Sequence, residues 1–221
     1  MKRREFLVIP SQTLGGALLY TLAREPLCLN AQGPLKIPLR FFTAAEARTV
    51  EAACARIIPS DESGPGAKEA GAVIYIDRQL AGPYGTDKYR YTKGPWIESV
   101  PEHGNQRKDT PQHIYRAGIP SLGEGFDKLP PDRQDEKLMA IERTPFFELL
   151  RTHTIEGTLC DPLHGGNAGM IGWQLIGYPG PLMSHREEIG KYLGIEYPRR
   201  APRSLEQIVG HKVKGWEDEE A

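Results

Sequence analysis

The sequence predicts an all-α protein, a single irregular helical domain of about five to seven helices joined by long Gly- and Pro-rich loops. Apolar residues recur at helical spacing in several separate stretches, and no run alternates apolar and polar residues cleanly enough for a strand. The 221 residues include 19 prolines and 24 glycines, which require long irregular connections. A hydrophobic content of 39% suffices for one core.

The first helix is predicted from Thr43 to about Ile57. Thr43 is a suitable N-cap, Glu46 completes a capping box three residues later, and Phe42 can pack back onto the helix. Cys54 falls on the inward stripe, and we interpret it as a small buried apolar residue without chemistry of its own. That stripe consists of Ala47, Val50, Cys54 and Ile57.

The second helix is predicted from about Ala67 to Leu80, with an inward stripe of Ala70, Val73, Ile76 or Asp77, and Leu80. We interpret Asp77 as a surface or paired side chain rather than a catalytic acid. Residues 82–110 then lack sustained periodicity and carry Tyr84, Tyr89, Tyr91 and Trp96. Two readings stay open for this arm: anchoring on a partner through its aromatic side chains, or folding over its own core.

Four further helices are predicted from caps and apolar spacing. Thr110 and Thr144 each precede a proline, which is typical of a helix start, and Gly157 is interpreted as the stop of the helix that Thr144 opens. Residues 198–221 are predicted to be an irregular tail. The helices are expected at 111–117, 131–143 (with Gln134, Leu138 and Ile141 inward), 145–156 and 184–193.

Seven glycines fall between Gly157 and Pro181, together with the aromatic residues Trp173 and Tyr178. Such a density of glycine indicates left-handed turns or close backbone approach, so we interpret the stretch as a looping surface packed against something else. It does not fit a phosphate loop, because no strand precedes it and no Gly-Lys-Ser/Thr ends it. The candidate interface residues are Trp96, Gly165, Gly166, Asn167, Trp173 and Tyr178.

Little catalytic or cofactor chemistry is indicated. His153 and Glu156 share a helix face, but a di-metal carboxylate bundle needs a second such motif and none occurs. Cys160 with Asp161 and His164 resembles part of a thiol nucleophile site, yet no helix N-terminus is there to lower the thiol pKa. Three cysteines without a C-x-x-C pair exclude the usual haem attachment and the common iron–sulfur clusters. The net charge of −1 shows no excess of positive charge of the kind that nucleic-acid binding requires.

Residues 1–31 are predicted to be an export signal, with cleavage after Ala31 or, as second choice, after Ala23. The apolar stretch that follows the basic start is too short and too polar for a good membrane span. The pattern is typical of the twin-arginine (Tat) pathway, which exports proteins already folded with their cofactors. The alternative is a basic start on an ordinary amphipathic helix. The signal residues are Arg3, Arg4, Phe6 and Leu7.

Several separated motifs resemble the gluconate 2-dehydrogenase subunit 3 family. They are FFELLRTHTIEG (146–157), DP (161–162), GGN (165–167) and GWQLIGYPG (172–180), preceded by IIPSDESGPGAKEAGAVIYIDRQLAGPYG (57–85) and IYRAGI (114–119). The motifs occur in the right order, and the resemblance spans roughly residues 40–195. The sequence departs from the family pattern at His164, in the 82–110 arm and after Tyr197.

Members of this family are small subunits of membrane-associated bacterial dehydrogenases for gluconate, glucose, fructose or sorbitol. The resemblance implies a large partner subunit that holds FAD in a fold of the glucose–methanol–choline (GMC) oxidoreductase type, and a multihaem cytochrome c subunit that takes the electrons. It also implies that the small subunit is non-catalytic, holds no cofactor, and carries the signal to the Tat translocase for both itself and the flavoprotein. Residues 32–197 would form this periplasmic subunit, with Cys160 as a candidate for a disulfide to the large subunit.

Two alternatives stay open beside this reading. One is a stand-alone periplasmic metalloenzyme that uses His153, Glu156 and His164. The other is a membrane-anchored scaffold whose signal is never cleaved. In the leading reading, the sugar that is oxidised would be selected in another chain.

Overall fold

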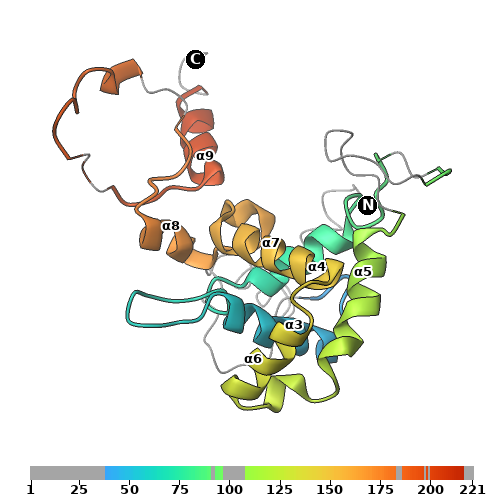
Figure 1. The fold of residues 1–221 in the computed structure, drawn as a ribbon. Helices are drawn as coiled ribbons and strands as arrows, with labels where there is room; N and C mark the ends of the chain where they lie inside the picture. The colour runs from blue at the N-terminus through green and yellow to red at the C-terminus, as the bar shows by residue number, and fades with distance from the viewer. Residues whose placement is uncertain are drawn as a thin grey trace, which may run out of the picture. The chain divides into compact units, whose positions relative to one another are not determined.

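The computed structural model describes residues 38–90, 93–96, 108–182, 186–196, 198 and 200–216. Within these ranges the regular structure is helical, and the only β-type pairing is one isolated bridge, between Asp61 and Gly64 (Figure 1). The predicted all-α class is therefore confirmed. The α-helices are α3 (Ala44–Ile57), α4 (Ala72–Ala81), α5 (Pro111–Gly118), α6 (Pro131–Ala140), α7 (Pro145–Leu159), α8 (Ile171–Ile176) and α9 (Leu205–Trp216).

The core of the fold is organised around α7. This helix packs along α4 and also contacts α3 and α5, and its residue Leu150 is completely buried. The prediction that the helix stops at Gly157 is wrong, because α7 continues to Leu159. Gly157 is instead the point where α4 crosses, and a side chain there would meet the Ala72 Cα at 3.0 Å.

The start of α3 is as predicted. The Thr43 hydroxyl accepts a hydrogen bond from the Glu46 amide, and the Glu46 carboxylate accepts one from the Thr43 amide at 2.8 Å. Arg56 near the end of α3 makes two hydrogen bonds of 2.7 Å with the carboxylate of Asp135 in α6. Ile57 is only partly buried, while the rest of the predicted stripe is fully inside, namely Ala47, Val50 and Cys54.

The second predicted helix begins later than expected. Residues 67–71 form turns, and the left-handed Gly71 (φ 69°) directly precedes α4, so the helix starts at Ala72 rather than Ala67. Its inward stripe nevertheless holds, because Ala70, Val73, Ile76 and Leu80 are all buried.

Asp77 of α4 is 2% exposed, so a surface position is wrong, whereas the prediction of a paired side chain is confirmed. Its carboxylate accepts hydrogen bonds from the amides of Arg40, Phe41 and Phe42 at 2.7, 3.0 and 2.8 Å. A buried carboxylate needs such donors to offset the loss of its hydration. Asp77 therefore fixes the segment that leads into α3.

The predicted helix starts at Thr110 and Thr144 are also confirmed. The hydroxyl of Thr110 accepts from the His113 amide at 3.2 Å, and that of Thr144 accepts from the Phe147 amide at 3.3 Å. Between these two starts lie the 3-10 helices Ile119–Leu122 and Phe126–Lys128, followed by α6. The predicted inward residues of α6 and the turn after it are buried, namely Gln134, Leu138 and Ile141.

Two predictions about the C-terminal part are wrong. The helix expected at 184–193 is, in its described residues, a single 3-10 turn (Arg186–Glu188) followed by further turns, because Gly190 and Gly194 both adopt left-handed backbone at φ 80° and 74°. The tail expected to be irregular contains α9. Ser204 caps this helix: its hydroxyl accepts from the Gln207 amide at 3.3 Å while the Gln207 side chain accepts from the Ser204 amide at 3.0 Å.

Candidate functional site

The glycine-rich stretch after α7 closes the C-terminal end of that helix. The carbonyls of Gly157 and Cys160 accept 2.8 Å hydrogen bonds from the backbone amide and the side-chain Nδ2 of Asn167, respectively. The Leu159 carbonyl accepts a 2.6 Å bond from the indole Nε1 of Trp173. The last carbonyls of a helix have no partners within the helix itself. In this structure, Asn167 and Trp173 supply the hydrogen-bond donors for the carbonyls at the end of α7.

Glycine is needed in this stretch because the backbones nearly touch. A Cβ on Gly166 would lie 2.1 Å from the Gly157 carbonyl oxygen, and one on Gly172 would lie 2.0 Å from that of Thr158. Asn167 has a left-handed backbone (φ 48°), and its Oδ1 accepts from the Gly172 amide at 2.8 Å. The predicted close backbone approach is confirmed, and the surface that the stretch packs against is α7 of the same chain.

Three of the six candidate interface residues lie inside the protein. Asn167 is fully buried, Trp173 is 4% exposed, and Gly166 is buried against α7. Asn167 and Trp173 bind the end of α7 and Gly166 packs against it, so these three positions expose little surface in this chain. Tyr178 and Trp96 are 41% and 36% exposed.

Gly165 is partly exposed, has a left-handed backbone (φ 97°) and lies against the Arg78 side chain. For Gly165, Tyr178 and Trp96, a role at an interface stays a prediction.

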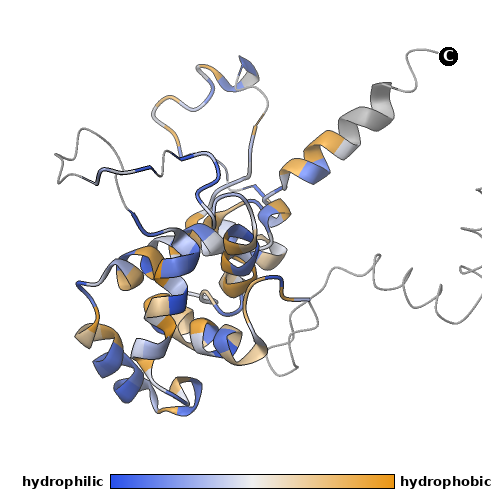
Figure 2. Ribbon diagram, turned by 90° about the vertical axis from the view of Figure 1, so that its right-hand side faces the viewer, coloured by the Kyte–Doolittle hydropathy of each residue, from blue (hydrophilic) through white to orange (hydrophobic). Residues whose placement is uncertain are grey.

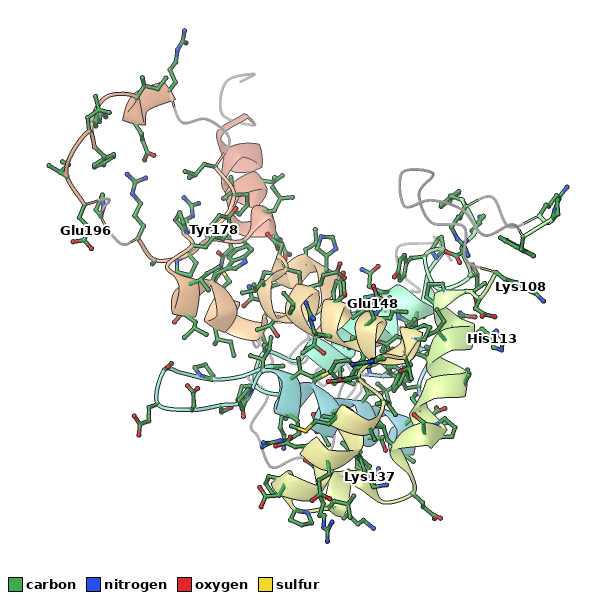
Figure 3. All side chains as sticks on the ribbon, viewed as in Figure 1. Lys108, His113, Lys137, Glu148, Tyr178 and Glu196 are labelled. Atoms are coloured by element: carbon green, nitrogen blue, oxygen red, sulfur yellow. The ribbon has the colours of Figure 1, made fainter. Side chains whose placement is uncertain are left out.

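An apolar hollow of about 520 Å³ lies beside Trp173. The Tyr178 ring meets the Trp173 ring edge-on, with centroids 5.1 Å apart and planes at 83°, and Figure 3 labels Tyr178 where the chain leaves α8. Ile176 on the same hollow is 59% exposed. The lining residues are Leu159, Asp161, Trp173, Ile176, Tyr178, Pro181 and Leu205. The hollow thus joins α7, α8 and the start of α9.

Asp161 holds two helix starts together. Its Oδ1 accepts from the Leu163 amide at 3.0 Å, and its Oδ2 accepts from the Leu205 amide at 2.7 Å, the first residue of α9. This capping role was not recognised in the sequence, although Asp before Pro is a known turn signal. His164 ends the short 3-10 helix that Asp161 opens, and its side chain is exposed. Its surroundings give no support for a thiol nucleophile site.

His153 is 1% exposed and lies between two tyrosines. Its Nδ1 is 3.0 Å from the Tyr115 hydroxyl and its Nε2 is 2.8 Å from the Tyr84 hydroxyl. The Tyr115 hydroxyl is completely buried and needs an acceptor for its proton. In the neutral ring we therefore assign Nδ1 as acceptor from Tyr115 and Nε2–H as donor to Tyr84.

These contacts give no support to the metalloenzyme alternative. Both ring nitrogens of His153 face tyrosine hydroxyls, and the Glu156 carboxylate accepts a 3.0 Å bond from the Tyr75 hydroxyl. Among the described residues, which include His153, Glu156 and His164, no three His, Cys, Asp or Glu side chains are grouped as metal ligands.

The two described cysteines have different surroundings. Cys54 is 1% exposed, accepts a 3.2 Å hydrogen bond from the Thr154 hydroxyl, and has its pKa raised to about 12 by burial. The predicted burial of Cys54 is confirmed. Cys160 is partly buried directly after α7, and burial raises its pKa to about 11. Neither thiol is in a disulfide within the described chain.

In the aromatic arm, folding over the core is borne out at Tyr84, while anchoring on a partner stays a prediction. Tyr84 is turned toward the core, where it contacts His153 with ring centroids 5.4 Å apart. Tyr89 is 83% exposed. Tyr91 lies outside the described residues, as do Cys28 and the predicted export signal with its cleavage site. No helix in the described part of the chain is both long and apolar enough to cross a membrane.

Comparison with known proteins gives one match. Residues 44–180 match the family model described as gluconate 2-dehydrogenase subunit 3. No curated protein and no solved structure matches the chain. The matched range begins with α3 and ends just after α8, so it contains the helical core and the closed end of α7.

Proposed function

The chain belongs to the gluconate 2-dehydrogenase subunit 3 family, and on this basis we propose that it is the non-catalytic small subunit and export escort of an FAD-dependent sugar or sugar-acid dehydrogenase. Its family is defined as a subunit of an oxidoreductase complex, so the chain works within that complex. FAD would be held by a GMC-type large subunit and haem c by a cytochrome subunit.

The family match over the helical core is the observation that carries this proposal. The contacts within the core are compatible with it, because three buried polar side chains are engaged in holding the fold. His153 binds two tyrosines, Asp77 binds three backbone amides, and Asn167 binds the end of α7. Such an interior suits a subunit that stabilises a partner rather than one that transforms a substrate.

Replacing both arginines of the predicted signal, Arg3→Lys with Arg4→Lys, tests the escort role. If the flavoprotein crosses the membrane only with this chain, then flavin-dependent dehydrogenase activity outside the cytoplasm should fall at least tenfold, and the flavoprotein should collect in the cytoplasm. Lys2→Arg, which leaves the arginine pair intact, should export both chains normally. Export of active flavoprotein by the double variant would contradict the proposal.

The covalent part of the proposal places an intersubunit disulfide at Cys160. The Cys160 thiol lies one residue beyond α7 and is partly buried. A disulfide there would require the large subunit to contact the C-terminal end of α7. On a non-reducing gel of the purified complex, Cys160→Ser should separate the two subunits. Cys54→Ser should leave the linked band in place, since that thiol is inside the core.

A further inference from the structure

Arg78 of α4 is a partly buried cation without a counter-charge. Among the arginines that the structure describes, three are partly buried: Arg56, Arg78 and Arg90. Arg56 pairs with Asp135, and Arg90 pairs with Asp87. The Arg78 guanidinium makes no ion pair or hydrogen bond with the described chain. A guanidinium stays charged at any physiological pH and offers five donors, so the pairing capacity of Arg78 is open.

The glycine-rich stretch holds the Arg78 side chain in place. A Cβ on Gly165 would lie 2.3 Å from its Nη1 and 2.8 Å from its Cζ, so the guanidinium lies directly against the Gly165 backbone. Gly165 is left-handed (φ 97°) and closes the 3-10 helix Pro162–His164. Because this contact already restricts the side chain, pairing it with a ligand would cost little further side-chain entropy.

The same turn also contacts the Cys160 thiol. Burial raises the pKa of this thiol, and the Gly166 amide, which faces the sulfur, opposes the rise. Gly165 therefore contacts Arg78, and the next residue in the chain contacts Cys160. The guanidinium and the thiol thus flank one pair of glycines.

The helices α4 and α7 add a second polar contact next to these residues. Tyr75, one turn before Arg78 in α4, donates a 3.0 Å hydrogen bond to Glu156, one turn before Cys160 in α7. Figure 2 shows hydrophilic positions interleaved with hydrophobic ones along the helices of the core, as expected where one helix face packs inward and the other lies outside. Glu156 is bonded to Tyr75 and forms no ion pair with Arg78 in the described chain.

A partner that reaches Cys160 would also cover Arg78. A disulfide needs the Cβ atoms of its two cysteines about 3.5–4.5 Å apart, so the backbone of the large subunit would lie against the Gly165–Gly166 turn. That contact would remove much of the water that remains around the guanidinium. A buried cation without a counter-charge is strongly unfavourable, and the described chain supplies none. The partner has to bring it.

We propose that Arg78 binds a carboxylate side chain, Asp or Glu, on the segment of the large subunit that contacts Cys160. The inference rests on the proposed function and adds the polar contact that selects this segment. The planar guanidinium can bond both oxygens of a carboxylate at once, which fixes the orientation of the segment as well as its position. Charge complementarity of this kind favours the correct partner over others.

The variants Arg78→Gln and Arg78→Glu test this contact in the full-length chain. Each is produced together with the dehydrogenase complex, and the dissociation constant from the flavoprotein is measured in reducing buffer, where no disulfide contributes. We expect Arg78→Gln to weaken binding at least tenfold and Arg78→Glu to weaken it further, because two carboxylates repel each other. Arg151→Gln on α7 removes an exposed arginine and is the matched control, which should bind as the unmodified chain does.

Two further measurements support the comparison. The melting temperatures of the variants should match that of the unmodified chain, because the guanidinium makes no bond within the described chain. Added salt should weaken the binding of the unmodified chain more than that of Arg78→Gln, since salt screens the ion pair that only the former makes.

The outcomes separate this inference from the function on which it rests. If the unmodified chain binds no flavoprotein, the proposed function itself fails. If it binds and Arg78→Gln binds equally well, or Arg151→Gln is weakened as much, only the Arg78 contact is refuted. Equal losses for Arg78→Gln and Arg78→Glu would indicate an uncharged acceptor and overturn the carboxylate.

A free acid is the other source of a carboxylate. Titration calorimetry of the isolated chain with sodium gluconate distinguishes the two sources, and we expect no binding. Gluconate binding that Arg78→Gln abolishes, while the affinity for the flavoprotein is unchanged, would assign Arg78 to a soluble acid and overturn the proposal.

Discussion

Asn167 shows how much of the structure depends on one side chain. It is fully buried, adopts a left-handed backbone that asparagine tolerates better than most residues, and bonds both to Cys160 and to Gly172. Its amide can do this because it offers a donor and an acceptor at once. No apolar residue of similar size could replace it.

Asn167→Ala should therefore lower the free energy of unfolding by about 2–4 kcal/mol, since it leaves a buried carbonyl and a buried amide without partners and strains the backbone. Urea denaturation followed by circular dichroism measures this loss. Gln174→Ala is the control: that side chain is exposed and bonds the Gly169 carbonyl at 2.9 Å, so its removal should cost under about 1 kcal/mol. Equal losses for the two variants would contradict the role assigned to Asn167.

Cys160 gives a prediction about pH. Burial raises its pKa to about 11, so at pH 8 roughly one thiol in a thousand is ionised, against about a quarter for an unperturbed cysteine. Because the thiolate is the nucleophile, alkylation of Cys160 by iodoacetamide should be slow at pH 8 and should rise about tenfold per pH unit up to pH 10. The same chain unfolded in guanidinium should react at the ordinary rate. Fast alkylation of the folded chain at pH 8 would refute the burial of this thiol.

At the scale of helices, starts were more predictable than ends. The starts of α3, α5 and α7 could be predicted from Thr43, Thr110 and Thr144, because N-capping depends on residues close in sequence. The end of α7 was placed wrongly at Gly157. A glycine that ends a helix and a glycine that allows another helix to cross closely cannot be distinguished from the local sequence, because the second role depends on α4. The donors to Asp77 lie more than thirty residues away, so their approach could not be read locally.

At α9 the sequence analysis missed a helix that the structure contains. Ser204 and Gln207 form a capping box that the sequence does contain, but the prolines and the acidic end favoured an irregular tail. The candidate site shows a similar limit: glycine spacing indicated close contact, while its target, the end of α7, depends on tertiary folding. Asn167 and Trp173 were predicted to lie at an interface with a partner. In the structure both are buried and bond the end of α7.

Asp161→Ala should loosen α9 without unfolding the core. The substitution removes the acceptor for the Leu205 amide, so hydrogen exchange at residues 205–210 should accelerate about fivefold or more, as expected for loss of a helix cap worth about 1 kcal/mol. Amides within α4 and α7 should exchange as in the unmodified chain. Glu206→Gln, an exposed change in the same first turn, is the control, and matching acceleration in it would argue against Asp161 as the tether.

At the scale of the whole molecule, the described chain has a helical core that ends near Gly180 and a C-terminal segment joined to it by few bonds. Core side chains such as Leu80, Tyr115 and Phe126 are completely buried, whereas the segment exposes much of its apolar surface. The buried core and the most exposed apolar residues of the described chain therefore belong to different stretches of sequence.

Truncation after Leu182 should reveal this division. Because no described helix packs extensively on α9, the free energy of unfolding of the core should change by less than about 2 kcal/mol. Calorimetry of the purified chain measures this change. Loss of the core transition would contradict the division.

The bonds that the Leu205 and Arg203 amides donate to Asp161 and Pro179 also bear on how such chains can diverge. A segment that enters and leaves the core at neighbouring points can gain, lose or exchange residues while the positions that hold it stay constant. Selection on the core and selection on the segment would then proceed almost independently. The residues after Gly180 could then change while the architecture around α7 is inherited unchanged.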